Sequence, residues 1–342
     1  MAGPLRLLTR LEAASPNRRQ RLAVAVVVAA LSAVLVSNAF RGAASYHSDF
    51  GIAWFGARAM LEGRDPYPLI GPGREFDIRW HPLYPATAMV AAIPFAALTE
   101  RLATMAFVAT SVFLLAYGIT RDGWHLIPLF VTEPFAASAR LGQWSILVTA
   151  ACFLPWLTFL TAGKPQAFLP VLAASRSRAP FLFAGTGGLA LLLISLALLP
   201  NWPAAWLDAM KSTSHLTPPI MRPGGFLILA VLCKWRRPES WLVLVMACVP
   251  QTWGWYNALP LFVVPRTLVE SGALATIVTI GALAGALIVP TPTSPDAFYG
   301  WVGALLVLTI YLPAVGLILR RPNTGEAFPF RRKFAERSPT GE

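Results

Sequence analysis

The sequence predicts an all-α protein, a polytopic transmembrane bundle of about 10–12 spans, and three observations support this fold class. The 342 residues are 56% hydrophobic and only 13% charged, with a mean hydropathy of +0.58. Soluble domains carry about 25% charged residues, so this chain has too few to cover a water-exposed surface. Apolar runs close to the ~20 residues that cross a bilayer recur along the chain. Basic residues gather at both ends, as they do in cytoplasmic segments of membrane proteins.

The distribution of charge predicts the topology. Residues 1–21 contain five arginines and one acid, and residues 320–342 contain six basic residues and three acids. Because basic flanks stay in the cytoplasm, we expect both termini of a multi-pass inner-membrane protein to be cytoplasmic. The segment after residue 320 is polar, and we expect a disordered basic tail. The net charge of +12 is therefore interpreted as topology and contact with anionic lipid rather than as nucleic-acid binding.

The expected spans follow in order within a transmembrane domain of residues 22–319. The first is 22–40, and an extracytoplasmic loop, 41–81, follows it with five basic and five acidic residues. Residues 82–98 and 102–119 are the next expected spans, joined by a cytoplasmic turn at Glu100–Arg101. The remaining expected spans are 124–138, 144–161, 165–175, 180–200, 223–235, two short spans within 239–268, 271–290 and 299–319.

Two further features belong to this topology. Residues 201–222 form a second extracytoplasmic segment. Seven basic residues should then lie on the cytoplasmic side: Arg140, Arg176, Arg178, Lys234, Arg236, Arg237 and Arg266.

The first loop contains an amphipathic pattern at residues 49–63. Apolar residues recur there with the helical period, and Asp65-Pro66 ends the run because proline cannot continue a helix. We expect an interfacial helix capped by Asp49, lying on the membrane surface; a loop helix packed on protein is the equal alternative.

Several motifs resemble those of a known family. Asp49-Phe50 follows the first span, then come Gly63-Arg64-Asp65-Pro66-Tyr67 and Trp80-His81-Pro82-Leu83-Tyr84-Pro85. Leu141-Gly142-Gln143 and Gly163-Lys164-Pro165-Gln166 appear later in the same order. The pattern resembles the polyprenyl-phosphate-dependent membrane glycosyltransferases of superfamily C, most closely glycosyltransferase family 87 of mannosyl- and arabinofuranosyltransferase type, over residues 22–265. The family fits two spans between Gly-Gln and Lys-Pro, whereas Gln143 and Lys164 are only 21 residues apart. One span there, or two half-spans broken at Pro155, would place Lys164 on different sides.

The resemblance implies an activity and a set of residue roles. A sugar would move from a polyprenyl phosphate to a hydroxyl of a lipid, glycan or protein acceptor on the extracytoplasmic face, with inversion. Asp49 would be the general base, which must lie within hydrogen-bond reach of the hydroxyl. The candidate partners of the donor phosphate are Arg58, Arg79, Lys164 and His215. The candidate sugar or acceptor contacts are His47, Tyr67, His81, Gln143, Gln251 and Tyr256.

Each of these residues also has a purely structural interpretation. Asp49 can be a helix cap or a solvated acid, and Arg58 and Arg79 can pair with acids of their own loop. Lys164 can extend its charge toward water from the end of a span. Gln143 and Gln251 can join helices by hydrogen bonds.

Cofactor chemistry has little support in the sequence. Cys152, Cys233 and Cys248 lie in apolar runs without a CxxC pair, so we expect no disulfide and no metal site from them. A single carboxylate at the site does not make a tight divalent cage, although a loosely held metal ion stays open.

Two functions of other classes compete with the transferase. One is a transporter or flippase of a lipid or small solute, which would place charges at mid-membrane on broken helices. The other is a non-catalytic membrane assembly partner. A cavity connecting Asp49 with Lys164 would favour the transferase.

Overall fold

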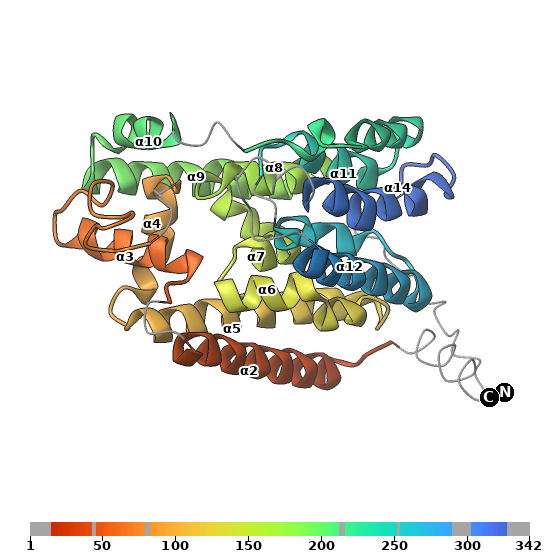
Figure 1. Cartoon of the computed structure of the whole chain (residues 1–342), viewed down its shortest axis with the longest axis horizontal. Helices are drawn as coiled ribbons and strands as arrows, with labels where there is room; N and C mark the ends of the chain where they lie inside the picture. The colour runs from red at the N-terminus through yellow and green to blue at the C-terminus, as the bar shows by residue number, and fades with distance from the viewer. Residues whose placement is uncertain are drawn as a thin grey trace, which may run out of the picture.

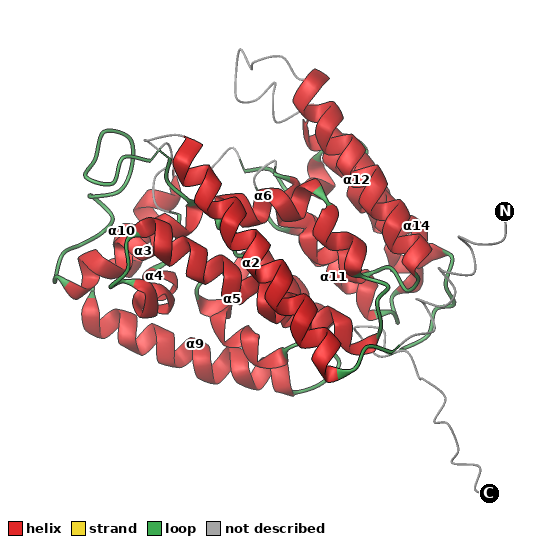
Figure 2. Ribbon diagram, turned by 90° about the horizontal axis from the view of Figure 1, so that it is seen from below, coloured by secondary structure: helices red, strands yellow, loops and turns green. Residues whose placement is uncertain are grey.

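The computed structural model describes residues 15–42, 46–78, 83–211, 216–251, 254–288 and 302–326. Within these residues the secondary structure is helical apart from one isolated bridge between Ile70 and Phe76. The predicted all-α class is therefore confirmed for the described chain. The helices pack mostly along the long axis of the molecule (Figures 1 and 2).

Five helices of the described chain are long and apolar enough to cross a membrane. They contain α2 (Arg18–Gly42), α5 (Glu100–Ile119), α9 (Ala179–Leu198), α12 (Leu268–Ile288) and α14 (Leu312–Leu319), the last as part of Val302–Leu319. α9 leaves large apolar side chains exposed, among them Leu182 at 65% and Leu193 at 58%. Such a surface suits lipid and not water, which agrees with the predicted membrane protein.

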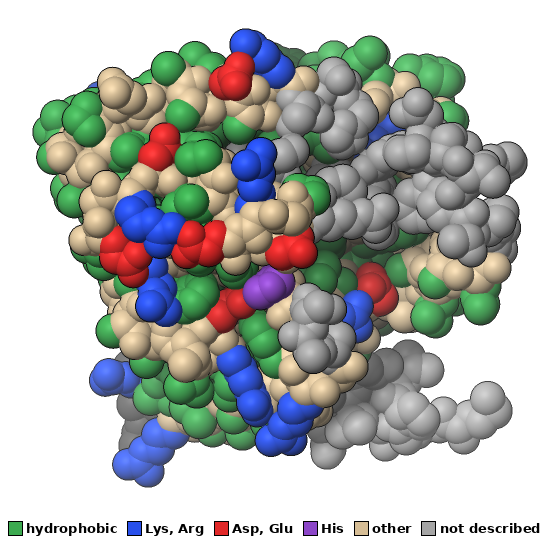
Figure 3. Space-filling model, turned by 60° about the vertical axis from the view of Figure 1, so that its left-hand side comes forward, with side chains coloured by type: hydrophobic (Ala, Val, Ile, Leu, Met, Phe, Trp, Pro, Cys, Tyr) green, Lys and Arg blue, Asp and Glu red, His purple; other side chains and the backbone are tan. Residues whose placement is uncertain are grey.

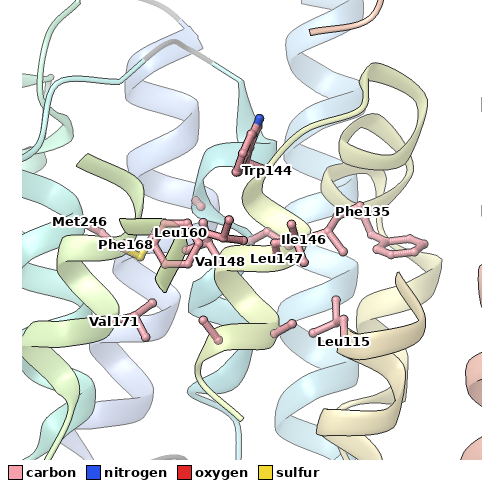
Figure 4. Close-up of a cluster of buried hydrophobic side chains, with 14 of the residues drawn as sticks. Leu115, Phe135, Trp144, Ile146, Leu147, Val148, Leu160, Phe168, Val171 and Met246 are labelled. Atoms are coloured by element: carbon pink, nitrogen blue, oxygen red, sulfur yellow. The ribbon is translucent and has the colours of Figure 1, made fainter. Parts of the chain in front are cut away.

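Shorter helices fill the space between these long ones. The α-helices are α3 (Asp49–Leu61), α4 (Ala86–Ala92), α6 (Glu133–Leu141), α7 (Ser145–Ala151), α8 (Pro165–Ala174), α10 (Trp202–Met210) and α11 (Pro238–Cys248). The 3₁₀ segments are η1 (Ile93–Phe95), η2 (Thr120–Asp122), η3 (Ile127–Val131), η4 (Pro155–Ala162), η6 (Pro219–Met221), η7 (Gly225–Lys234) and η8 (Trp255–Val263), and η9 (Val307–Tyr311) is a π-helical turn. The core packs α7 against α5, α8 and η8, with the apolar side chains of Figure 4 at its centre.

The two loops that were predicted to be extracytoplasmic lie at one end of the molecule, which we call the α3 end. α3, α4 and α10 gather there (Figure 1). Trp206 of α10 donates its indole N–H to the Leu83 carbonyl at 3.1 Å, which joins the two loops. The start of α2 and the end of α14 lie toward the opposite end.

The prediction of a span at 82–98 is wrong. α4 and η1 together are too short to cross the molecule, and the chain turns back so that Trp54 Nε1 donates to the Leu98 carbonyl at 3.1 Å. Glu100 then accepts the backbone N–H of Ser48 at 3.0 Å, so the Glu100–Arg101 turn lies at the α3 end rather than at the opposite one. Pro94 in η1 helps to end the helix early, because proline removes a backbone donor.

The segment expected at 144–161, as one span or as two half-spans broken at Pro155, forms two short helices, α7 and η4. The chain turns at 152–154, directly before Pro155, where the residue preceding a proline is disfavoured in the α conformation. The chain therefore returns to the α3 end, where Thr87 Oγ1 donates to the Ala162 carbonyl at 2.5 Å. This extra turn decides the end at which Lys164 lies.

α3 is present as predicted, but its N-cap is Ser48 and not Asp49. Ser48 Oγ accepts the Gly51 N–H at 2.9 Å. The apolar face of α3 is buried by α4 and α5, so it packs on protein. Gly56 allows this approach, since a Cβ there would clash with Met89. Contact of α3 with lipid stays a prediction.

A buried ion network closes the opposite end. Arg237, with a fully buried side chain, contacts Glu239 at 3.2 Å, and Arg266 reaches the same carboxylate at 3.1 Å. Arg321 pairs with Glu270 at 2.8 Å. Glu326 also contacts Arg237, so residues 320–326 are tied to the bundle and the prediction of a disordered tail from residue 320 is wrong for them. Residues 327–342 lie outside the described chain.

Candidate functional site

Asp49 is the first residue of α3, at the end of the molecule where the loops gather. Ser48 anchors the helix start, because its hydroxyl also lies 2.8 Å from Thr104 Oγ1 on α5. The Asp49 side chain is partly exposed and has no hydrogen-bond partner among the described residues. A partly exposed carboxylate without a partner at a helix start is available to bind a ligand.

Lys164 lies beside this carboxylate. It stands between η4 and α8, where Pro165 begins the next helix. Its Nζ is 3.4 Å from the Tyr84 hydroxyl and 5.2 Å from the centre of the Tyr84 ring. Asp49 and Lys164 interact electrostatically without forming a direct ion pair. The fold therefore brings together opposite charges from residues that are 115 positions apart in the sequence.

Burial sets the proton affinities of this pair. Burial raises the pKa of Asp49 from 3.8 to about 6, and the Lys164 charge opposes that rise. Burial lowers the pKa of Lys164 from 10.5 to about 8, and the Asp49 charge opposes that fall. At neutral pH both groups are mainly ionised, and Asp49 is a stronger base than an ordinary aspartate. A carboxylate with a pKa close to the working pH suits general base catalysis.

Tyr84 is the residue that joins the parts of this site. It is buried, and its pKa is raised by burial, by Asp49 and by Tyr256. Its carbonyl accepts the Tyr67 hydroxyl at 3.1 Å, and its ring lies 6.3 Å from that of Trp144. Tyr256 therefore lies in the electrostatic surroundings of Tyr84, and its contact with a sugar or acceptor stays a prediction. Tyr67 holds the backbone of Tyr84 and has its hydroxyl occupied.

A second aromatic hydroxyl lies on the other side of Asp49. Tyr46 donates to the Arg140 carbonyl at 2.5 Å, and burial raises its pKa, with Asp49 adding to the rise and Arg140 opposing it. Arg140 is thus at the α3 end, and its predicted position on the opposite side is wrong. The reason is that α6 ends near Ser48 and Phe50, where Gly142 adopts a positive φ of 66° that turns the chain.

Arg58 and His47 line a pocket to which neither Asp49 nor Lys164 contributes. Arg58 follows Asp49 by nine residues, which places it on the opposite side of the helix. Its guanidinium carbon lies 5.1 Å from the centre of the Trp54 ring. It lines a separate pocket of about 330 Å³ with His47 and Glu100. His47 Nδ1 is 2.7 Å from Glu100 Oε2. The prediction that Arg58 and Lys164 hold one phosphate is not supported by this arrangement.

The two glutamines differ in their surroundings. Gln143 is buried next to Trp144, and its side chain has no hydrogen-bond partner in the described chain. Figure 4 shows the Trp144 indole nitrogen pointing away from the aliphatic cluster, and this nitrogen is buried without a partner among the described residues. Gln251, in the loop after α11, instead donates to the Tyr311 hydroxyl at 3.0 Å, so it joins this loop to η9.

The other candidates are not placed. Arg79, His81 and His215 lie outside the described residues. Asp208 is on the surface and contacts Lys211 at 2.8 Å, as expected of a solvated acid. No group of three His, Cys, Asp or Glu that could hold a metal ion occurs in the described ranges.

Little in the sequence indicates that Tyr84, Glu100 and Arg140 lie near Asp49. Tyr84 was visible only as part of the aromatic-proline motif before residue 86. Glu100 and Arg140 look like ordinary charges at helix ends. Figure 3 shows acidic and basic side chains gathered on the face at this end of the molecule, around a histidine.

No family model, curated protein or solved structure matches this chain.

Proposed function

We propose that this protein is a membrane glycosyltransferase that moves a sugar from a polyprenyl-phosphate donor to a hydroxyl acceptor at the α3 end. The observation that carries the proposal is the electrostatic interaction of the Asp49 carboxylate with the Lys164 ammonium, which form no direct ion pair. Both side chains are partly exposed, and Asp49 has no hydrogen-bond partner in the described chain. The motif resemblance supplies the reaction class, and the position of Lys164 beside Asp49 supports it.

The residues can then be assigned roles. Asp49 takes the proton of the acceptor hydroxyl as the acceptor oxygen forms its bond to the anomeric carbon. The bond from that carbon to the phosphate oxygen breaks, and the leaving polyprenyl phosphate keeps the electron pair. Lys164 neutralises the developing phosphate charge, with the Tyr84 hydroxyl 3.4 Å from its Nζ as a second donor. Attack from the Asp49 side and departure toward Lys164 give inversion.

The decisive experiment compares sugar-containing lipids and glycans from cells that lack the gene with cells that carry the wild-type chain. The variants are Asp49→Asn and, as a matched control, Asp208→Asn, an exposed acid at the same end. We expect a hexose or pentose addition that is present with the wild type and Asp208→Asn and absent with Asp49→Asn. An Asp49→Asn chain that inserts in the membrane and still restores the product would refute the proposal.

A further inference from the structure

An apolar groove of about 550 Å³ lies between α2 and the η3–α6 segment. Leu31 and Val131, which both line it, are 65% and 81% exposed. Ser32 and Trp124 are the lining residues that carry polar side-chain atoms, and the Ser32 hydroxyl donates to the Val28 carbonyl at 2.8 Å. The groove therefore offers apolar surface and no free hydrogen-bonding group from Ser32.

The shape of the groove suits a hydrocarbon chain. Its α2 wall runs from Val24 to Leu35, roughly 16 Å at 1.5 Å per residue. This is about half of the ~30 Å hydrocarbon core of a bilayer. The groove exists because η3 and α6 are short helices with a break at Thr132, so no continuous helix fills the space beside α2.

A cation stands where the groove approaches the α3 end. Ala136 lines the groove, and Arg140 follows it by one helical turn on nearly the same face of α6. Arg140 is exposed and forms no ion pair with any described residue. Glu133 on the same helix interacts with it only at longer range. The positive end of the groove is thus complementary to an anion attached to an apolar chain.

We propose that the groove and Arg140 bind an anionic lipid, with one chain along α2 and the phosphate on the Arg140 guanidinium. Tyr46 contacts Arg140 and lies in the electrostatic surroundings of Asp49, so the head group of this lipid extends toward Asp49. Lys164 lies elsewhere, against Tyr84, which leaves it for the donor phosphate. The lipid is therefore the acceptor, an assignment that rests on the proposed function, whereas the binding site itself does not.

The test is photolabelling of the full-length Asp49→Asn chain in detergent micelles, where no turnover can consume a lipid. The probes are phosphatidylglycerol and diacylglycerol, which has no phosphate, and both carry the same diazirine acyl chain. Phosphatidylglycerol should label peptides from 24–35 and 124–136 about ten-fold more than diacylglycerol, the factor expected for one charged hydrogen bond. Equal labelling by the two probes would overturn the proposal.

Matched variants separate the two parts of the site. Arg140→Gln should abolish the preference for phosphatidylglycerol, and Arg140→Lys should keep part of it; Arg178→Gln, at an exposed arginine of the opposite end, should leave it unchanged. Val28→Trp should remove labelling by both probes, unlike Leu182→Trp on the exposed face of α9. A preference that survives Arg140→Gln refutes the phosphate contact. Labelling does not require sugar transfer. A failure of labelling would therefore not contradict the transferase proposal, and a failure of transfer would not contradict the lipid site.

Discussion

Replacing Asp49 with asparagine should stabilise the protein, although it removes the proposed catalytic base. Burial raises the pKa of Asp49 from 3.8 to about 6, so the ionised form is disfavoured in the folded state. A shift of about 2 pKa units corresponds to about 3 kcal/mol of folding free energy. The asparagine amide also loses water on burial, so we expect a net gain of about 1–3 kcal/mol.

The sign of the effect follows from proton binding. Between pH 3.8 and about 6 the folded chain holds a proton on Asp49 that the unfolded chain has released. The contribution of Asp49 to the free energy of unfolding therefore falls as pH rises through that range, and the full destabilisation by its ionised form is present above about pH 6. The gain from Asp49→Asn should be complete at pH 8 and should shrink toward the amide contribution alone near pH 4.

Thermal unfolding in detergent at pH 8 and pH 4 measures this difference. Asp208→Asn is the control, because Asp208 is exposed and Lys211 lowers its pKa, so its loss should give no gain. An Asp49→Asn chain that is less stable than the wild type at pH 8, or equally stabilised at both pH values, would refute the reasoning.

Three other perturbations follow from the same structure. Lys164→Gln removes the charge that opposes the rise in the Asp49 pKa. The acidic limb of the pH profile of transfer should therefore move up by roughly 1 pH unit. A limb that stays in place would contradict an electrostatic interaction between Asp49 and Lys164. Glu100→Ala removes two contacts at the start of α3 and should cost about 1–3 kcal/mol in thermal unfolding, and an unchanged melting temperature would argue against this anchor. Glu239→Gln leaves buried arginine charge unpaired and should lower the free energy of unfolding by about 3–5 kcal/mol. The same change at the more exposed Glu326 should lower it by less than about 1 kcal/mol. Similar stabilities of the two variants would show that burial does not determine the loss.

Some features of the site could be predicted from residue order alone. Asp49 follows the first apolar run, and Ser48 with the apolar period after it predicts a helix start there. The position of Arg58 on the opposite side of the helix from Asp49 could also be predicted, because nine residues on a helix amount to about two and a half turns. The choice of both Arg58 and Lys164 as candidate partners of the donor phosphate did not take this into account, and Lys164 does not line the pocket that Arg58 lines.

Other features depend on which end of the bundle each short segment reaches. Hydropathy reports that a segment is apolar, and this holds equally for a helix that crosses and for one that turns back inside protein. The segment 82–98 turns back after a short helix, and the segment 144–161 turns back at its middle. Hydropathy does not distinguish either of them from a helix that crosses. The positions of Glu100 and Lys164 depended on these turns.

The amino-acid composition by itself determined that this chain is helical and suited to a membrane, because so few charges leave apolar surface that only lipid or protein can cover. Only the tertiary structure decided that Asp49 faces Lys164 and that Arg140 ends an apolar groove. These neighbours come from helices distant in sequence, and their meeting depends on turns at Pro155 and Gly142 whose direction is set by packing against the rest of the bundle.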